Sequence, residues 1–371
     1  MTNGKDWFRP AVANLRGYEP GEWPAIDAGV IKLNSNENPY PPSPQVLAAL
    51  VSLSGELLRR YPDPRAETFR QVVGKTFGIP TDWVIAGNGS DDVLTLLVRA
   101  CAGQSAGEAQ RVLAYPTPTY VLYRTLAAIQ PAETIEIPYE TTGDEWRLPV
   151  QALIAAQAAV TLIATPNSPT GHVVPIADLR TLATGLKGVL AVDEAYIDFA
   201  GAGADRASLE LIRDFENVVV LRTLSKGYGL AGLRLGFGCA QPTLLAGLFK
   251  IKDSYNVDAI ALRLGAAAIT DQVYKQATVE KVVVAREQLR AALQGLGFRV
   301  WRSHTNFLLA QPPDDRAYFL YKGLRAQQIM IRYFNQPGLN DKLRITVGTP
   351  PQNQRLVKAI KDLLNGDAYR L

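Results

Sequence analysis

The stretch RTLSKGYGLAGLRLGFG, residues 222–238, decides the fold, because its glycines admit two interpretations. Gly227, Gly229 and Gly232 match the G-x-G-x-x-G pattern of a dinucleotide-binding loop, and the apolar run before them predicts a strand. A dinucleotide-binding unit also needs a crossover helix before its next strand. Here the strand-like run LGFGCA (235–240) follows Gly232 after only two residues, too few for such a helix. The spacing therefore argues against a dinucleotide site.

The second interpretation centres on Lys226, which lies between the predicted strand and the glycines. Thr223 and Ser225 place hydroxyl groups beside it, and Arg234 follows closely. Hydroxyls, backbone amides and an arginine fork together suit a phosphate monoester. A lysine beside a phosphate site indicates a phosphate-bearing aldehyde held as a Schiff base, namely pyridoxal phosphate. Taken alone, Lys226 is more simply interpreted as a solvated surface lysine, so the rest of the chain must supply the other contacts.

Pyridoxal phosphate needs a carboxylate at its ring nitrogen and polar groups at its ring hydroxyl. Asp193 ends the apolar run VLAVD, and Tyr196 follows it in the same turn. Asn167 lies in the proline-rich turn after the run TLIATP. Because ligands of open α/β sheets gather at the carboxyl ends of strands, these three side chains are candidates for one site. Each also has a simpler interpretation: Asp193 or Glu194 as a helix cap, and Asn167 as part of a turn.

A helix start provides a second phosphate-binding feature. Gly87 and Gly89 allow close backbone approach, and Ser90 and Asp91 open a predicted helix whose first amides favour an anion. The alternative, a simple helix cap, uses the same geometry. Tyr120, in YPTPTYVLY, is a candidate for stacking on the cofactor ring, although a single aromatic residue is more often part of a core.

The pattern along the chain predicts an α/β fold. Short apolar strands alternate with helical patterns, which indicates a mostly parallel sheet flanked by helices. We expect this large cofactor-binding domain to span residues 46–258. A smaller α+β domain should combine residues 1–45 with residues 259–371. In that second part the pattern predicts one long helix over about 261–296, three short strands, and a final helix near 352–364.

Composition excludes several classes of function. The 371 residues include 39 basic and 35 acidic side chains, interspersed, so neither nucleic acid nor a membrane surface is an expected partner. Two distant cysteines, Cys101 and Cys239, and two histidines, His172 and His304, supply neither a disulfide framework nor a metal site. No signal-like or membrane-length apolar run occurs in the sequence. We therefore expect a soluble, cytoplasmic protein that acts on small molecules.

A family resemblance rests on motifs spread over nearly the whole chain: LNSNENPYPPSP, RYPDP, GNGSDDVL, PTPTY, TPNSPTG, VDEAYIDF, RTLSKGYGLAGLRLGFG and LRITVGTP. On these motifs the chain resembles the fold-type I pyridoxal-phosphate-dependent aminotransferases, and most closely the histidinol-phosphate aminotransferase group. Two positions depart from the pattern. Pro41 stands where the family usually has glycine, and Asp92 stands where glutamate is commoner. Neither is a proposed catalytic group.

The resemblance implies a role for each matching residue. Lys226 would hold the cofactor and move the proton at the substrate Cα, and Asp193 would pair with the ring nitrogen. Tyr196 and Asn167 would contact the ring hydroxyl, and Tyr120 would stack over the ring. The phosphate would be held by the following residues: Ser90, Asp91, Thr223, Ser225 and Arg234.

The resemblance also implies a substrate and an assembly. Arg344 and Arg332, with Asn167, would bind the substrate, and Tyr18 would close over it. The reaction would exchange an amino group between L-histidinol phosphate and 2-oxoglutarate, with imidazole acetol phosphate and glutamate as the other pair, in histidine biosynthesis. Tyr61, in RYPDP, resembles a tyrosine that reaches the cofactor phosphate of the neighbouring subunit, which implies a homodimer with shared sites.

Three alternatives remain open at the level of sequence. Related enzymes of the same fold act on aromatic amino acids, and others decarboxylate threonine phosphate; the aromatic aminotransferase is the stronger alternative. A non-catalytic, regulatory member is the third. The presence of Lys226, Asp193 and Arg344 together argues against it, because a protein without chemistry has no need of all three.

Overall fold

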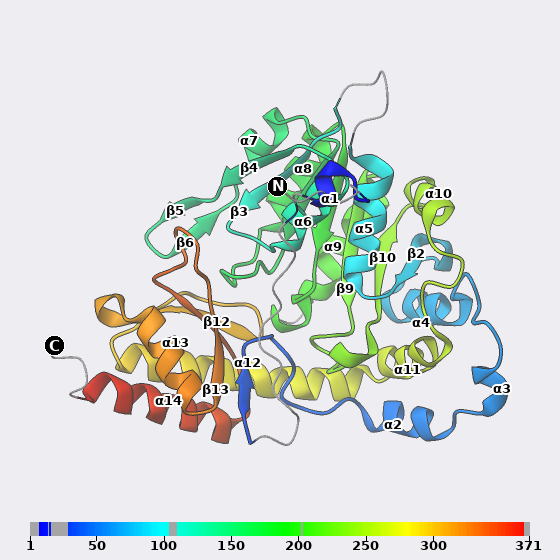
Figure 1. The fold of residues 1–371 in the computed structure, drawn as a ribbon. Helices are drawn as coiled ribbons and strands as arrows, with labels where there is room; N and C mark the ends of the chain where they lie inside the picture. The colour runs from blue at the N-terminus through cyan, green and yellow to red at the C-terminus, as the bar shows by residue number, and fades with distance from the viewer. Residues whose placement is uncertain (1–6, 14, 16–28, 104–109, 202, 367–371) are drawn as a thin grey trace.

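Two β-sheets of unequal size organise this computed structural model (Figure 1). It describes residues 7–13, 15, 29–103, 110–201 and 203–366. The larger sheet has seven strands, in the spatial order β2 (Val84–Gly87), β10 (Gly236–Ala240), β9 (Val218–Thr223), β8 (Val189–Asp193), β7 (Val160–Ala164), β3 (Leu113–Thr117) and β4 (Thr134–Pro138). The smaller has five, in the order β1 (Ile31–Leu33), β13 (Ile329–Tyr333), β14 (Leu343–Thr346), β12 (Phe307–Gln311) and β11 (Arg299–Val300). A separate pair joins β5 (Glu140–Thr142) to β6 (Glu145–Arg147).

Helices cover both sheets. Those before and within the large sheet are α1 (Pro10–Ala13), α2 (Pro44–Val51), α3 (Gly55–Leu58), α4 (Glu67–Phe77), α5 (Ser90–Cys101), α6 (Leu122–Ile129), α7 (Val150–Ala155), α8 (Ile176–Gly185), α9 (Ala204–Asp214) and α10 (Pro242–Ile251). Those that follow are α11 (Ala259–Thr270), α12 (Gln272–Gly295), α13 (Ala317–Ala326) and α14 (Pro350–Asn365). No helix among the described residues is long and apolar enough to cross a bilayer.

The large sheet is parallel except for β10, which runs antiparallel to both of its neighbours. Gly236, at the start of β10, pairs with Thr223 on β9 and with Gly87 on β2. The carboxyl ends of β2 and β9 therefore meet the start of β10 at one edge of the sheet. The antiparallel direction also explains why β10 can follow β9 after a short loop, since no crossover helix is needed. This arrangement confirms the predicted α/β fold class and excludes the dinucleotide-binding unit.

The strands of the large sheet are apolar runs because both of their faces are buried. All five residues of β7, VTLIA, are buried, as are all six of β9. Helices α4, α8, α9 and α11 pack on one face, and α5, α6 and α10 on the other. Each fully buried Val or Leu side chain stabilises the fold by about 1.5–3 kcal/mol relative to an exposed one. This core fixes the edge at which the loops meet.

The small sheet brings the N-terminal segment to the same region. Strand β1 pairs in parallel with β13, and the chain after β1 then returns toward the large sheet. The predicted long helix over 261–296 is wrong in one respect, because α11 and α12 are separate helices. Asp271 ends α11 with non-helical angles (φ −94°, ψ 65°), and its side chain accepts from the amide of Tyr274 to cap α12. An aspartate is a preferred residue at such a helix start.

Candidate active site

Lys226 lies in the loop after β9, and its side chain is partly buried. Its Nζ donates to the carbonyl oxygen of Ser35 at 3.2 Å and lies 5.6 Å from the centre of the Tyr196 ring. The backbone carbonyls of Lys226 and Gly227 accept from Asn38 Nδ2 at 3.0 and 3.2 Å. The N-terminal segment therefore holds both the amine and the backbone of this lysine.

Asp193 is the last residue of β8 and is only 5% exposed. One carboxylate oxygen accepts from the Tyr123 hydroxyl at 2.9 Å, and the other from the amide of Ala195 at 3.2 Å. Burial raises the pKa of Asp193 to about 6; the Tyr123 hydrogen bond opposes this rise, and the charge of Asp91 adds to it. An ionised carboxylate in such a setting would be stabilised by a cation placed against it.

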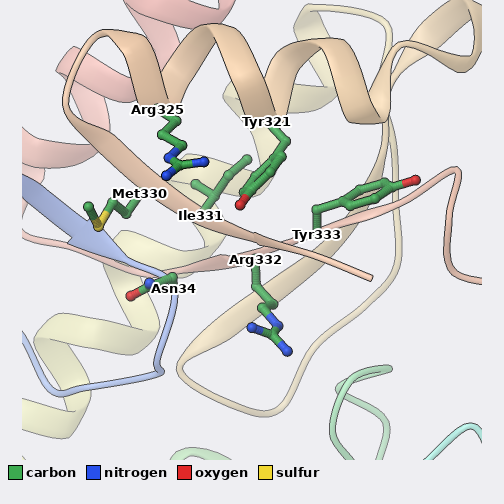
Figure 2. Close-up of a pocket in the computed structure, with 7 residues that line it drawn as sticks. All are labelled: Asn34, Tyr321, Arg325, Met330, Ile331, Arg332 and Tyr333. Atoms are coloured by element: carbon green, nitrogen blue, oxygen red, sulfur yellow. The ribbon is translucent and has the colours of Figure 1, made fainter. Parts of the chain in front are cut away.

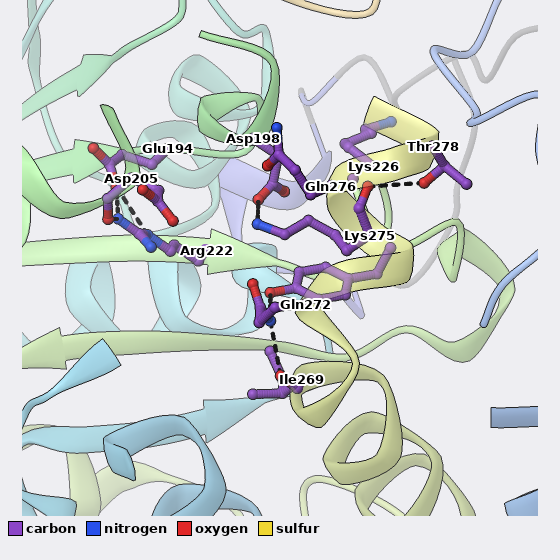
Figure 3. A network of polar contacts seen from close by, with 12 residues as sticks. Glu194, Asp198, Asp205, Arg222, Lys226, Ile269, Gln272, Lys275, Gln276 and Thr278 are labelled. Atoms are coloured by element: carbon purple, nitrogen blue, oxygen red, sulfur yellow. Dashed lines mark hydrogen bonds and ion pairs between the residues drawn. The ribbon is translucent and has the colours of Figure 1, made fainter. Parts of the chain in front are cut away.

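The acids next to Asp193 have cations of their own (Figure 3). Glu194 accepts from Arg222 Nε at 2.9 Å and from Arg222 Nη2 at 2.7 Å. Asp198 accepts from Lys275 Nζ, on α12, at 3.0 Å. Asp193 forms no ion pair with an Arg or Lys among the residues that the structure describes. It is therefore the acid in this run that can receive an external cation.

A cradle for an anion lies at the same edge of the large sheet. The first amides of α5, at Ser90 and Asp91, form one side. Thr223 Oγ1 donates to Ser225 Oγ at 2.9 Å, and Arg234 Nη1 also donates to Ser225 Oγ at 3.3 Å. Arg234 Nη2 lies 3.7 Å from Asp91 Oδ2. Helix amides, two hydroxyls and a guanidinium are the donors that a phosphate group requires.

Two glycines keep this cradle open. Gly89, just before α5, has φ +84°, and a Cβ placed on it would lie 2.9 Å from Arg234 Nη2. A Cβ on Gly236 would collide with the backbone nitrogen of Ser90. Side chains at these positions would fill the space where the donors converge, so the glycines belong to the cradle itself.

Asn167 is fully buried in the loop after β7. Its Nδ2 donates to the carbonyl oxygen of Pro118 at 3.0 Å and to Thr170 Oγ1 at 2.7 Å. Its Oδ1 accepts from Thr119 Oγ1 at 2.7 Å. The amide is thus held from the loop after β3 and from its own loop, which lie side by side at the edge of the sheet.

Two tyrosines flank this group of residues. Tyr120 donates a long hydrogen bond of 3.5 Å to Asp91 Oδ1. The hydroxyl of Tyr196 accepts from Asn36 Nδ2 at 2.8 Å, and its ring meets the edge of Phe307 with centres 5.2 Å apart. Tyr196 therefore contacts both the N-terminal segment and the small sheet.

The two predicted substrate arginines lie on the small sheet. Arg332 on β13 pairs in register with Arg344 on β14. Arg344 Nη1 donates to Ser168 Oγ at 3.1 Å, and Nη2 donates to the carbonyl oxygen of Asn34 at 2.9 Å. The Arg332 guanidinium lies 5.5 Å from the centre of the Phe334 ring. Arg344 therefore connects the small sheet to the loop that holds Asn167.

A solvent-open hollow of about 340 Å³ lies beside Arg332. Figure 2 shows Arg332 leaving β13 on the side opposite Tyr321 and Arg325, which descend from α13. The lining consists of Asn34, Tyr321, Arg325, Met330, Ile331, Arg332 and Tyr333. The gap forms where β1 ends and β13 continues toward its pairing with β14.

The structure brings most of the predicted residues to one region: Ser90, Asp91, Tyr120, Asn167, Asp193, Tyr196, Thr223, Ser225, Lys226 and Arg234, joined through Ser168 and Asn34 to Arg344. Tyr61 lies apart from them, 81% exposed and stacked on Tyr255 at 4.5 Å. Tyr18 falls outside the described residues. Those residues hold no group of three or more metal-ligating side chains.

Several contacting residues were absent from the sequence predictions. Tyr123, which binds Asp193, lies in the first turn of α6, three residues after Tyr120, which precedes the helix. Asn36 and Asn38 contact Tyr196 and the Lys226 backbone. The signal in the sequence was the polar run NSNEN, which has no apolar period of its own; in the structure Asn34 and Asn36 are buried and the other three residues are partly buried.

Comparisons with known proteins identify the family to which the chain belongs. The chain matches the family described as aminotransferase class I and II over residues 28–360. It is 57% identical over 364 residues to histidinol-phosphate aminotransferase 1 of Trichormus variabilis, covering 98% of this chain and 100% of that protein. It is 42% identical over 356 residues to histidinol-phosphate aminotransferase of Citrifermentans bemidjiense, covering 96% and 98%. The crystal structure of histidinol-phosphate aminotransferase from Sinorhizobium meliloti, in complex with pyridoxal-5'-phosphate, superposes with a TM-score of 0.85 at 24% identity, covering 98% of each chain. The chain therefore belongs to the family of class I and II aminotransferases.

Proposed function

We propose that this protein is a pyridoxal-phosphate-dependent histidinol-phosphate aminotransferase of histidine biosynthesis. It exchanges an amino group between L-histidinol phosphate and 2-oxoglutarate, giving imidazole acetol phosphate and glutamate. Relatives of that name match nearly the whole chain at 57% and 42% identity, and they do not favour the aromatic alternative. In the structure, the observation that carries the proposal is the meeting of Lys226, Asp193 and the anion cradle at one edge of the large sheet.

The described residues fit pyridoxal phosphate at each of its polar groups. The cradle between α5 and Arg234 is kept open by Gly89 and suits the phosphate. Asp193 is a buried carboxylate whose pKa is raised by burial, and a protonated ring nitrogen placed against it would stabilise its charged form. Lys226 offers the primary amine that an aldehyde requires. Asn167 donates both Nδ2 protons to Pro118 and Thr170, so it would meet the ring hydroxyl through Oδ1, which has a second lone pair.

The chemistry divides between the cofactor and the chain. Bound pyridoxal phosphate supplies an electron sink for the electron pair left at the substrate Cα. Lys226 Nζ removes and returns the Cα proton, and it is held for this task by the Ser35 carbonyl and the face of Tyr196. Asp193 keeps its negative charge against the ring nitrogen, with the Tyr123 hydroxyl and Ala195 amide fixing its orientation.

Arg332 and Arg344 recognise the acidic end of each substrate. Histidinol phosphate carries a phosphate where an amino acid carries its carboxylate, and two guanidinium forks suit a group of nearly two negative charges. Glutamate presents carboxylates to the same pair. The bonds from Arg344 to Ser168 and Asn34 hold it close to Asn167 and Lys226, so acid recognition and proton transfer share one site.

A homodimer in the cytoplasm completes the proposal. Tyr61 is exposed, and its neighbours Leu58 and Val51 are exposed apolar side chains at 60% and 87%. Such a cluster suits a subunit contact through which Tyr61 reaches the cofactor phosphate of the partner. Free Cys101 and Cys239 are compatible with a reducing compartment.

Absorption spectroscopy tests the function directly. The purified protein with pyridoxal phosphate should show a visible band that is lost on adding L-histidinol phosphate and restored by 2-oxoglutarate. Lys226→Ala should lose both the band and multiple turnovers, whereas Lys250→Ala, which removes an exposed lysine at the end of α10, should keep them. A band that responds to phenylalanine or tyrosine but not to histidinol phosphate would move the assignment to an aromatic aminotransferase. A protein that forms no band would refute the role of Lys226.

A further inference from the structure

A chain of side-chain hydrogen bonds leads from Asn167 to a histidine that the mechanism does not use. Asn167 Oδ1 accepts from Thr119, and Asn167 Nδ2 donates to Thr170 Oγ1, both at 2.7 Å. Thr170 Oγ1 in turn lies 2.7 Å from Nδ1 of His172. Two short bonds in series therefore connect the buried amide to the imidazole, and a third holds the amide from the side of Thr119.

The partners fix the direction of each bond in this chain. The carbonyl of Pro118 can only accept, so the Asn167 atom that faces it at 3.0 Å is Nδ2, which then also donates to Thr170. The hydroxyl of Thr170 accepts from Asn167 and has one proton of its own to give. His172 Nδ1 is its partner among the described residues, so Nδ1 is assigned as the acceptor, and the ring proton is assigned to Nε2, which is buried and has no hydrogen-bond partner among the described residues.

The imidazole packs against two aromatic neighbours. Tyr139 meets its edge with ring centres 4.6 Å apart at 87°, and Trp146 stacks at 6.4 Å and 15°. Burial lowers the pKa of His172 to about 4, and the nearby His304 adds to the shift. The ring therefore stays neutral near pH 7, and its Nδ1 lone pair remains available to Thr170.

The loop is also closed by backbone hydrogen bonds of its own. The backbone nitrogen of Asn167 donates to the backbone carbonyl of His172, and the backbone nitrogen of Gly171 donates to the backbone carbonyl of Asn167, each at 2.8 Å. The backbone thus closes the turn by itself. The side-chain bonds act instead on the orientation of the Asn167 amide.

We propose that His172 is a positioning residue that acts through Thr170 to hold the Asn167 amide in the orientation in which it meets the cofactor ring. By accepting the Thr170 proton, His172 directs the threonine oxygen to accept from Asn167. The catalytic consequence rests on the proposed function, since Asn167 is assigned to the ring hydroxyl there. The direction of the bonds rests on this chain alone.

Histidine NMR on the loaded enzyme tests the direction of the bonds. The chain has only two histidines, so ¹⁵N correlation spectra contain two imidazoles, and His304→Asn assigns them. His172 should carry its proton on Nε2 and remain neutral at pH 6. Thr170→Val should abolish this tautomer preference, and Thr170→Ser, which retains the hydroxyl, should preserve it. A parent enzyme with the proton on Nδ1 of His172 would overturn the proposal.

A matched pair of variants tests the catalytic consequence. His172→Asn places an acceptor oxygen near the position of Nδ1, whereas His172→Leu removes the acceptor. The leucine variant should lower kcat/KM about 10-fold and move the pH midpoint of the visible band, and the asparagine variant should stay within about 3-fold of the parent. Thr170→Val should reproduce the leucine result, and it serves in its place if the leucine variant does not fold.

The failure of each idea gives a distinct result. Loss of thermal stability in His172→Leu and Thr170→Val, with an unchanged kcat/KM and an unchanged midpoint of the band, would show a structural role only and overturn the positioning proposal. A parent enzyme that forms no visible band would refute the proposed function. The His172 tautomer, measured by NMR in the same protein after addition of pyridoxal phosphate, would still decide the direction of the hydrogen bonds.

Discussion

Arg332 on β13 and Arg344 on β14 lie directly opposite each other as register partners of an antiparallel strand pair. Side chains at such positions leave the sheet on the same face, and like charges there repel. Arg344 is fixed by Ser168 and by the carbonyl of Asn34. A repulsive pair held this way is stabilised by an anion that carries more than one negative charge. A phosphate group carries nearly two negative charges, whereas a carboxylate carries one.

Removal of either charge should therefore weaken binding of the phosphate-bearing substrate more than binding of glutamate. Arg332→Gln should raise KM for L-histidinol phosphate about 10- to 100-fold, the loss of one charge-assisted fork, with a smaller rise for glutamate. Arg180→Gln is the control. It removes an exposed arginine on α8 that pairs with Asp214 on α9, and it should change the KM of neither substrate. Steady-state kinetics with both substrates measure the ratio. Equal rises for the two substrates would contradict a phosphate-specific pair.

The cradle includes Gly89, whose φ of +84° would strain any side chain and whose added Cβ would lie 2.9 Å from Arg234 Nη2. Gly89→Ala should weaken pyridoxal phosphate binding at least about 10-fold and destabilise the protein by about 1–3 kcal/mol through backbone strain. Gly232→Ala is the matched control, because a Cβ there meets nothing within 4 Å. Fluorescence titration with the cofactor and urea unfolding measure the two effects. A cofactor affinity equal to that of the parent would argue against a phosphate at this helix start.

Asp193 gives a pH dependence of defined sign. Its folded pKa, about 6, lies above the ordinary 3.8, so the folded state holds the proton more tightly than the unfolded state. The resulting stability is fully present below pH 3.8 and is lost as the pH rises through 6. Without cofactor, Asp193→Asn should be more stable than the parent at pH 8 by up to about 3 kcal/mol, and this advantage should vanish near pH 4.

Urea unfolding of the cofactor-free proteins at pH 8 and pH 4 measures the effect of Asp193. With cofactor the order should reverse at pH 8, because pyridoxal phosphate stabilises the protein that binds it more tightly. Activity of the variant should fall by orders of magnitude, since the ring nitrogen loses its counter-charge. Equal stability of the two cofactor-free proteins at pH 8 would show that burial of the ionised Asp193 carboxylate does not destabilise the folded state.

The sequence allowed the edge of the large sheet to be predicted because its signals are local. Asp193 and Lys226 each follow an apolar strand, and parallel strands bring their carboxyl ends together. Ser90 begins a helix after a glycine pair, which is also a local pattern. Their meeting follows from strand direction alone, without knowledge of any long-range contact.

Long-range pairing explains what could not be predicted. The facing of Arg332 and Arg344 depends on the register between β13 and β14, which neither segment specifies alone. The bonds from Asn36 and Asn38 cross from the N-terminal segment to residues about 160 to 190 positions later. The break at Asp271 interrupts a helical pattern that is continuous in apolar spacing. The predicted domain boundary at 258–259 stays a prediction.

Tyr61 allows a subunit-mixing experiment that depends on where each residue acts. It is exposed and stacks on Tyr255 in its own chain, and we propose that it serves the partner's cofactor. Tyr61→Ala and Lys226→Ala should each be poorly active alone. In a mixed dimer, one site combines an intact Lys226 with an intact Tyr61, so co-refolding the two variants should restore activity toward half of the parent value per mixed dimer. Tyr318, another exposed tyrosine, provides the control. A mixture of Tyr318→Ala with Lys226→Ala should show the same activity as a mixture of the parent with Lys226→Ala. If mixing restores nothing while light scattering shows mixed dimers, Tyr61 does not act across the subunit contact.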